Sequence, residues 1–283
     1  MPSFQAHGKL LITAEYLVLS GAKALAVPTA KGQRMSVTPR TQGGTEWTAL
    51  DHLGNVRFQG CLGQGNSDLK FAEQLVQAAL GHANHWPDAQ IETVLEFAPE
   101  WGWGSSSSLT SLVAQWLQVD PMSLHESVSL GSGYDVACAQ APGPILYQKG
   151  HANQPVDLSQ WPKEHIRFLY LGQKQDSQSE VAKFLDRQVD SSCIDQVNDL
   201  SEALVDANNA TTLMRLIETH EALMSDVLSQ PTIKSQRFSD SPLAFKSLGA
   251  WGGDFAMAVA EDPSEFGYLD KSNLISLSWS EVF

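Results

Sequence analysis

Residues 101–108 read Trp-Gly-Trp-Gly-Ser-Ser-Ser-Ser and carry the strongest local signal in the chain. The pattern of apolar residues predicts a strand over 91–97 before them and a helix over 106–118 after them. Glycines let the backbone turn tightly, and serines that begin a helix leave N–H groups pointing toward a bound anion. The segment therefore predicts a phosphate-binding loop. Taken alone, it fits a serine-rich helix cap with glycines in a turn equally well.

The loop differs from two common nucleotide-binding sequences. The chain's only Gly-Lys pair, Gly8-Lys9, lacks the leading glycine and the following Ser/Thr of a Walker A motif, which are Ser3 and Leu10 here. Asp254-Phe255-Ala256 is not the DFG element of a protein kinase, and no HRD element occurs. Support for nucleotide binding must therefore come from other segments.

Composition limits the classes of partner. The chain has 283 residues, of which 42% are hydrophobic and 18% charged, as is typical of a globular protein. A formal net charge of −14 argues against nucleic-acid and membrane partners, which bind clustered Lys and Arg. Cys61, Cys138 and Cys193 fit no metal or redox spacing, and no apolar run is long enough to span a membrane. We expect a cytoplasmic protein with a small-molecule substrate.

Strands and helices are mixed without regular βαβ alternation, which favours an α+β fold. The polar segment 151–164 contains two prolines, and we place a domain boundary there, giving domains 1–158 and 159–283. The predicted strands and meander segments are 9–19, 34–38, 45–60, 144–148, 166–171, a loop-to-strand stretch at 248–260, and 274–283. The further predicted helices are 67–82, 177–190, 193–207 and 210–229.

Three other segments combine glycine with a charged residue. His7-Gly8-Lys9 precedes Glu15-Tyr16, Ser132-Gly133-Tyr134-Asp135 places a carboxylate in a turn of small residues, and Lys246–Asp254 contains the Gly252-Gly253 pair. Locally, an aspartate in a turn is more often a capping residue than a catalytic one, and a Gly-Gly pair is more often a tight bend.

In this order, the four segments resemble the GHMP kinase superfamily (galacto-, homoserine, mevalonate and phosphomevalonate kinases) from Gly8 to about Val259. Residues 8–29 look closest to the mevalonate and phosphomevalonate kinase branch. Residues 131–137 and 246–255 resemble a bacterial subgroup named for a Gly-Tyr-Asp-Ile-Ala signature. The resemblance implies a two-domain fold, with a ribosomal-protein-like N-terminal α/β domain and a ferredoxin-like C-terminal domain. It also implies a monomer or homodimer that uses ATP and Mg²⁺ to phosphorylate an alcohol or phosphorylated alcohol.

The resemblance also implies residue roles. Asp135 matches the general base that faces the acceptor hydroxyl, and Lys9 matches the lysine that favours a developing alkoxide. Ser106 is the expected Mg²⁺ ligand. The expected nucleotide-binding residues are Gly102, Trp103, Gly104, Ser105, Ser106, Ser107, Ser108, Gly252 and Gly253. Those expected on the substrate side are Glu15, Tyr16, Gly249 and Ala250.

The chain departs from the family pattern at several positions. Ala14 stands where relatives have glycine, and Trp103 and Trp251 replace smaller residues, for which we expect packing roles. Leu124 stands where mevalonate kinases have a Mg²⁺-binding Glu, and Glu126 is out of register. The alternatives are therefore a kinase for another small alcohol, or a protein of this fold that binds a nucleotide or partner without catalysis.

The remaining histidines give weak signals. His220-Glu221 lacks the second histidine of a zinc-protease motif. We expect both residues on a solvated or substrate-facing helix rather than at a metal.

Overall fold

The computed structural model describes residues 2–81, 86–172, 184, 189–249 and 251–283. Internal contacts divide the chain into two compact units. Unit 1 comprises Met1–Lys9, Thr29–Pro99 and Trp103–Gln140, and unit 2 comprises Leu10–Pro28, Glu100–Gly102 and Ala141–Phe283. These units follow contacts rather than sequence order, so the division into domains 1–158 and 159–283 stays a prediction.

The sheet of unit 1 joins strands that are distant in the sequence. Its strands are β1 (Ser3–Leu11), β2 (Ala24–Pro39), β3 (Thr45–Leu50), β4 (Val56–Cys61) and β5 (Ala89–Leu95). The order is β4-β3-β5-β2, with β1 also paired to β2. β5 runs antiparallel to β2 and parallel to β3. The predicted meander is therefore wrong, because β5 lies between two strands that are consecutive in sequence; alternating apolar residues identify a strand but not its distant partner.

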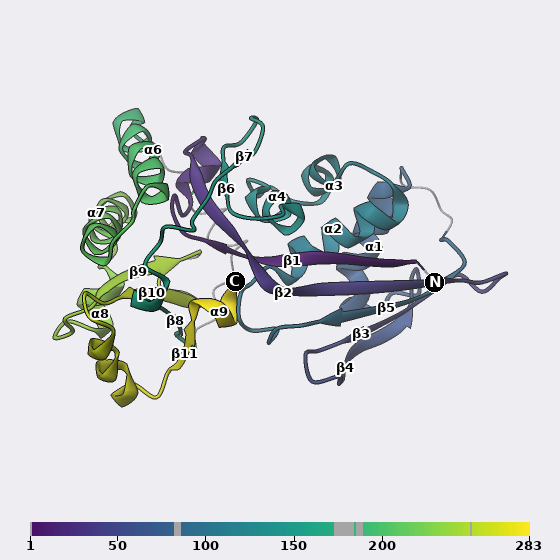
Figure 1. Cartoon of the computed structure of the whole chain (residues 1–283). Helices are drawn as coiled ribbons and strands as arrows, with labels where there is room; N and C mark the ends of the chain where they lie inside the picture. Colours follow the sequence, from purple (N-terminus) through teal and green to yellow (C-terminus); the bar gives the residue numbers. More distant parts are fainter. Residues whose placement is uncertain (1, 82–85, 173–183, 185–188, 250) are drawn as a thin grey trace. The chain divides into compact units, whose positions relative to one another are not determined.

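Helices cover one face of this sheet (Figure 1). They are η2 (Ser67–Leu69), α1 (Lys70–Ala79), α2 (Ser105–Leu117), α3 (Pro121–Val128) and α4 (Tyr134–Gln140). Leu75 of α1 and Leu112 of α2 pack with Trp47 and Ile91 of the sheet, and all four side chains are buried. The predicted helix at 67–82 is present, but its cap is Asn66, whose side chain accepts the Asp68 N–H at 3.0 Å.

Unit 2 contains a four-stranded antiparallel sheet of order β11-β8-β10-β9. Its strands are β8 (Ile166–Tyr170), β9 (Ala244–Leu248), β10 (Phe255–Val259) and β11 (Ile275–Ser278). The helices of unit 2 are η1 (Leu17–Ser20), η3 (Lys163–His165), α6 (Ser191–Val205), α7 (Ala210–Leu228), α8 (Ile233–Arg237), η4 (Pro263–Lys271) and α9 (Trp279–Val282). The succession β8, α6–α8, β9, β10, η4, β11 is the βαββαβ pattern of a ferredoxin-like domain.

Two short strands complete unit 2. β6 (Ile145–Tyr147) pairs antiparallel with the first residues of β2, and β7 (Gln154–Pro155) pairs with β6. The predicted helices at 193–207 and 210–229 are confirmed as α6 and α7, whereas most of the one predicted at 177–190 lies outside the described residues. β9 was not predicted, because Lys246 interrupts its apolar pattern. None of the helices within the described ranges is both long and apolar enough to cross a membrane.

Candidate active site

The phosphate-loop segment leads directly into α2. Gly104, with φ +86°, adopts a left-handed conformation that a side chain would strain. The Ser108 N–H donates to the Gly104 carbonyl at 2.9 Å, which is the first hydrogen bond of the helical ladder. The N–H groups of Ser105, Ser106 and Ser107 precede that bond, so they form the kind of helix start that binds anions.

The serines of this helix start divide into two pairs. Ser107 and Ser108 are buried: the Ser107 hydroxyl donates to the Gly104 carbonyl at 3.0 Å, and the Ser108 hydroxyl donates to Gln33 Oε1 at 2.8 Å. Their side chains therefore stabilise the loop itself. Ser106 is exposed and Ser105 half-buried, so solvent reaches both residues at the helix start.

Lys9 lies against the same loop. Its backbone N–H donates to the Trp103 carbonyl at 2.9 Å. A Cβ added to Gly104 would lie 3.0 Å from Lys9 Cγ and 3.2 Å from Lys9 Cε, so the lysine side chain crosses the glycine. A Cβ on Gly8 would lie 2.9 Å from the Trp103 carbonyl oxygen. Both glycines therefore allow β1 to approach the loop closely.

The end of the Lys9 side chain reaches α4, which carries Asp135. Asp135 is half-buried in the first turn of α4, and its Oδ1 accepts the Val136 N–H at 3.0 Å. Lys9 Nζ lies 5.5 Å from the centre of the Tyr134 ring. Loss of hydration raises the pKa of Tyr134, and the positive charge of Lys9 opposes that rise. Burial likewise raises the pKa of Cys138, on which Lys9 and Asp135 act in opposite directions.

Both tryptophans that depart from the family pattern are packed inside the protein. The Trp103 indole is fully buried, with its ring centre 5.8 Å from that of Phe97. Trp251 is 5% exposed, and its Nε1–H donates to the Pro231 carbonyl at 3.3 Å. Packing therefore accounts for both indoles, and Trp103 lines the loop only through its backbone.

The glycine turn between β9 and β10 belongs to unit 2, as does Gly102. Gly249 and Gly252 have positive φ values of +72° and +68°. Ala250 lies outside the described residues. A Cβ on Gly102 would lie 1.7 Å from Asp254 Oδ2, so the carboxylate at the end of this turn rests directly on the first loop glycine. That contact was not predictable from the sequence, because only the fold brings Asp254 to Gly102.

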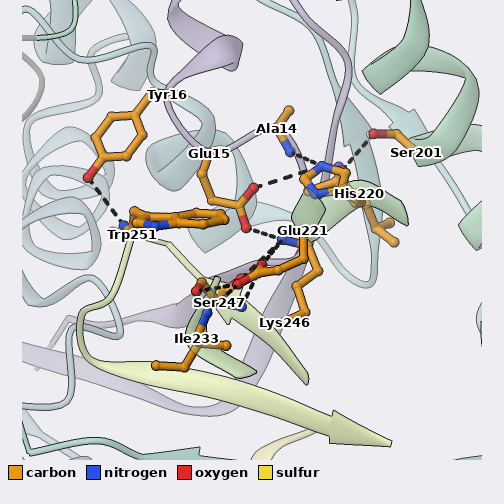
Figure 2. Close-up of polar contacts among 12 residues, drawn as sticks. Ala14, Glu15, Tyr16, Ser201, His220, Glu221, Ile233, Lys246, Ser247 and Trp251 are labelled. Atoms are coloured by element: carbon orange, nitrogen blue, oxygen red, sulfur yellow. Dashed lines mark hydrogen bonds and ion pairs between the residues drawn. The ribbon is translucent and has the colours of Figure 1, made fainter. Parts of the chain in front are cut away.

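Glu15 lies in a buried polar cluster of unit 2 (Figure 2). Its side chain has no exposed surface and forms an ion pair with Lys246 of β9, which is also fully buried. Glu221 of α7 accepts hydrogen bonds from the Ser247 N–H and hydroxyl at 3.0 and 2.9 Å, and its carboxylate lies 3.9 Å from Lys246 Nζ. The Glu15 carboxylate is thus paired with a residue of the protein itself, and its direct contact with a substrate stays a prediction.

His220 completes this cluster by holding the turn that contains Glu15. The Ala14 N–H donates to His220 Nε2 at 3.0 Å, and the Trp251 N–H donates to the Tyr16 hydroxyl at 3.2 Å. Our expectation that His220 and Glu221 lie on a solvated or substrate-facing helix surface is wrong: they are 0% and 2% exposed. Their face of α7 packs on β9, and a polar pair alone does not reveal that orientation.

Burial controls protonation in the cluster. It raises the pKa of the Glu15 carboxyl to about 7, against the opposing attraction of Lys246. It also holds the pKa of His220 well below the usual value, and the charge of Lys246 acts in the same direction. At neutral pH, His220 is therefore a neutral hydrogen-bond acceptor.

Few protein groups near the loop can hold Mg²⁺. Leu124 is buried in the core of unit 1 and its side chain has no atom that can bind a metal, and Glu126 is exposed. No cluster of three or more His, Cys, Asp or Glu with metal-binding geometry occurs in the described part of the chain. Ser106 nevertheless carries a hydroxyl oxygen at a helix start of the kind that binds anions, and Mg²⁺ on a nucleotide typically keeps water and phosphate oxygens as its other ligands.

Comparisons with solved structures identify the fold. The chain matches a Streptococcus pneumoniae phosphomevalonate kinase in complex with phosphomevalonate and AMPPNP (TM-score 0.72, 18% identity, 98% of this chain and 100% of that one). It matches a Methanococcus jannaschii mevalonate kinase (0.70, 13%, 98% and 96%) and a Lactococcus lactis galactokinase complexed with galactose (0.66, 14%, 98% and 92%). Neither a sequence-family profile nor a curated protein matches the chain.

These matches cover almost the whole chain, so the predicted α+β GHMP kinase fold is confirmed. At identities below one fifth, they establish the fold and not the substrate. The chain's own residues must therefore support any assigned activity, and the proposed bacterial subgroup stays a prediction.

Proposed function

We propose that the chain is an ATP-dependent kinase that transfers the γ-phosphoryl group to the hydroxyl of a small alcohol or phosphorylated alcohol similar to mevalonate or phosphomevalonate. One observation carries the proposal. The Lys9 side chain crosses Gly104 at the start of α2, and its Nζ lies 5.5 Å from the ring centre of Tyr134, the neighbour of Asp135. A helix start of the kind that binds anions, a cation and a carboxylate therefore belong to the same unit, which supports the proposal.

The helix start would hold the ATP phosphates. The N–H groups of Ser105–Ser107 supply hydrogen bonds, and the helix dipole contributes only about 0.3–1 kcal/mol at an exposed site. The Ser106 hydroxyl fits Mg²⁺, which prefers oxygen ligands. When bound, Mg²⁺ would neutralise charge on the phosphates. Gly102, Gly252 and Gly253 belong to the proposed nucleotide-binding set through their backbone.

Lys9 and Asp135 would act on the acceptor. The acceptor oxygen attacks the γ-phosphorus, the bond to the β–γ bridging oxygen breaks, ADP leaves, and the hydroxyl proton passes to the Asp135 carboxylate. Because phosphoryl transfer has a loose transition state, orientation and charge stabilisation matter more than base strength. An ordinary carboxylate is therefore sufficient, and the Lys9 ammonium stabilises negative charge developing on the acceptor oxygen.

The substrate-side assignments form a weaker part of the proposal. Tyr16, Gly249 and Ala250 are proposed on the resemblance to the superfamily. Glu15 would act by fixing the turn at residues 14–16, since its carboxylate is paired with Lys246.

A turnover assay tests the proposal. Purified protein with ATP and Mg²⁺ is screened against mevalonate, phosphomevalonate, galactose and a panel of other alcohols, and ADP release is measured. We expect release with one acceptor class and its loss in Asp135→Asn, while Asp157→Asn keeps it, because Asp157 only caps an exposed turn through the Ser159 N–H at 2.8 Å. Nucleotide binding without turnover across the panel would contradict the kinase proposal and favour a nucleotide-binding protein.

A further inference from the structure

The Asp254 carboxylate occupies the space that a side chain on Gly102 would need. A Cβ added to Gly102 would lie 1.7 Å from Asp254 Oδ2 and 2.4 Å from its Cγ, far inside van der Waals contact. The φ of Gly102 is +68°, a backbone conformation that also favours glycine. Both residues belong to unit 2, so the contact is a property of that unit alone.

The backbone of Asp254 is fixed by the sheet of unit 2. Asp254 directly precedes β10, and its carbonyl accepts the Leu171 N–H at 2.9 Å. This bond extends the antiparallel β8–β10 pairing by one residue beyond the pair formed by Phe255 and Tyr170. The carboxylate is therefore held by the end of a paired strand, which is a more precise support than the middle of the glycine turn.

The residue before Gly102 is anchored on the same two strands. The Trp101 ring meets the Phe255 ring edge to face, with centres 5.7 Å apart and an interplanar angle of 78°. Its centre also lies 6.4 Å from that of the Tyr170 ring. Aromatic pairs favour such tilted and edge-to-face arrangements. Trp101 and Gly102 thus contact the adjoining ends of β8 and β10, one through an indole and the other through the Asp254 carboxylate.

The charge of Asp254 does not explain its position beside a phosphate loop. A carboxylate near a bound phosphate repels it, since both groups are negative. Its packing on Gly102 gives a different reason for its place. Gly102 lies two residues before Gly104, the residue at which α2 begins, so a fixed Gly102 limits the paths by which the chain can enter the helix.

We propose that Asp254 is a positioning residue, whose carboxylate fixes Gly102 and thereby the course of the phosphate loop into α2. The role rests on the proposed nucleotide site and adds to it the group that holds the first glycine of the loop. Asp254→Asn keeps the shape of the side chain and removes its charge, whereas Asp254→Ala removes the group that contacts Gly102. Comparing the two variants therefore separates position from charge.

The first experiment measures the contact without a ligand. Gly102→Ala should lower the melting temperature more than Gly54→Ala, whose φ of +83° imposes a similar strain but whose added Cβ meets nothing within 4 Å. We expect an excess loss of about 4 °C or more, because overpacking adds to the strain. In an Asp254→Ala background the excess should fall by at least about half, since the nearest remaining Asp254 atom is Cβ, at 3.0 Å. No excess, or an excess that Asp254→Ala leaves unchanged, overturns the proposal.

The second experiment measures the consequence for ligand binding. Calorimetric titration with ATP and Mg²⁺ should give an affinity at least about tenfold lower for Asp254→Ala, and within about threefold of the parent for Asp254→Asn. Asp262→Ala is the matched control, because Asp262 of the same unit caps η4 by accepting the Ser264 N–H at 2.8 Å. It should lower stability and keep the affinity. Equal losses in the two Asp254 variants, or tighter binding by both, would assign the effect to charge and overturn the positioning role.

Turnover separates this role from a catalytic one. In an active parent, Asp254→Ala should raise KM for ATP about tenfold or more with a smaller change in kcat, because Asp254 acts on the loop and not on the reacting atoms. An affinity and a KM for ATP that Asp254→Ala leaves unchanged would also overturn the proposal. If the parent binds no ATP, the proposed function fails, and the melting temperatures alone decide whether Asp254 holds Gly102.

Discussion

Glu15 and Lys246 form an ion pair from which solvent is excluded, since neither side chain has any exposed surface. They are separated by 231 positions in the sequence. Taking two charges out of water is costly, and their attraction offsets that cost only while both partners and their hydrogen bonds are present. The pair connects β9 to the turn that follows β1. It should therefore contribute more to the free energy of unfolding than an exposed ion pair does.

Lys246→Met should strongly destabilise the protein. It leaves the Glu15 and Glu221 carboxylates buried without a cation, which costs about 3–5 kcal/mol. Lys234→Met is the matched control, because Lys234 pairs with Glu218 at the surface, where such pairs contribute at most about 1 kcal/mol. Urea unfolding above pH 7 measures both. Equal losses in the two variants would mean that the buried pair adds no more stability than a surface pair.

The pH dependence of stability should reveal two opposing groups in this cluster. The folded-state pKa of Glu15 is raised from 4.5 to about 7, so folding takes up a proton there, and stability rises as pH falls through that window. The pKa of His220 is lowered, so only the unfolded chain binds that proton, and stability falls as pH drops below 6.5. In the parent, the two effects nearly cancel between pH 6.5 and 4.5.

Glu15→Gln should remove that compensation. Relative to the parent, the variant should lose up to about 1.4 kcal/mol of stability for each pH unit of acidification in this window. Denaturant midpoints measured across the range test the difference. Parallel pH profiles for the two proteins would show that Glu15 does not change its protonation on folding.

Gly104→Ala should weaken nucleotide binding at least about tenfold in a folded protein. The new Cβ would lie 2.6 Å from Ser107 Oγ and 3.0 Å from Lys9 Cγ, at a positive φ. Disturbing even one N–H bond to a charged phosphate costs roughly tenfold in affinity. Gly54→Ala is the control, since its φ is +83° but nothing lies within 4 Å of the added atom. Calorimetric titration with ATP should give a lower affinity for Gly104→Ala than for Gly54→Ala. Equal affinities would argue against a nucleotide site at this loop.

Ser106→Ala should lower turnover with little loss of stability, whereas Ser108→Ala should lower stability. Ser106 is exposed, so its loss should change stability by about 0.5 kcal/mol or less, but lower Mg²⁺-dependent turnover at least about tenfold. Ser108 is buried, and its loss leaves Gln33 Oε1 without its donor, which costs roughly 1–3 kcal/mol of stability. Thermal unfolding and ADP release, measured on both variants, test the distinction. Full activity of the Ser106→Ala protein would show that Ser106 is not a Mg²⁺ ligand.

Ala14→Gly should be almost neutral for stability. Ala14 has φ +63°, a left-handed conformation that costs about 1–2 kcal/mol for a residue with a Cβ. Glycine relieves this strain but loses a buried methyl group, worth about 0.8 kcal/mol, and carries its own entropic cost of about 0.5–1 kcal/mol. Unfolding free energies should agree within about 1 kcal/mol.

The helices were largely predictable from the sequence, whereas two predicted strands were wrong over much of their length. The stretch 9–19 contains only the end of β1 (Ser3–Leu11) and then η1 (Leu17–Ser20), and the stretch 274–283 ends in α9 (Trp279–Val282). Helix α2 was expected over 106–118 and spans Ser105–Leu117, since apolar spacing near 3.6 residues marks the buried face of a helix. The order of the sheet was not predictable, because β5 pairs between β2 and β3 from a distant part of the chain. Strand β9 was not predicted, because it contains Lys246 and a charged residue in a strand usually marks an exposed face.

The sequence by itself determined which residues form the loop, the helix after it and the four glycine-rich segments, because these depend on local backbone freedom and periodicity. It also placed Lys9 and Asp135 in a recognisable order. Only the tertiary structure decided which groups meet: the Lys9 side chain lies on Gly104 with its ammonium near the Tyr134 ring, and Glu15 pairs with Lys246. Those contacts join residues far apart in the chain, and the packing that excludes water around them sets their charges and protonation.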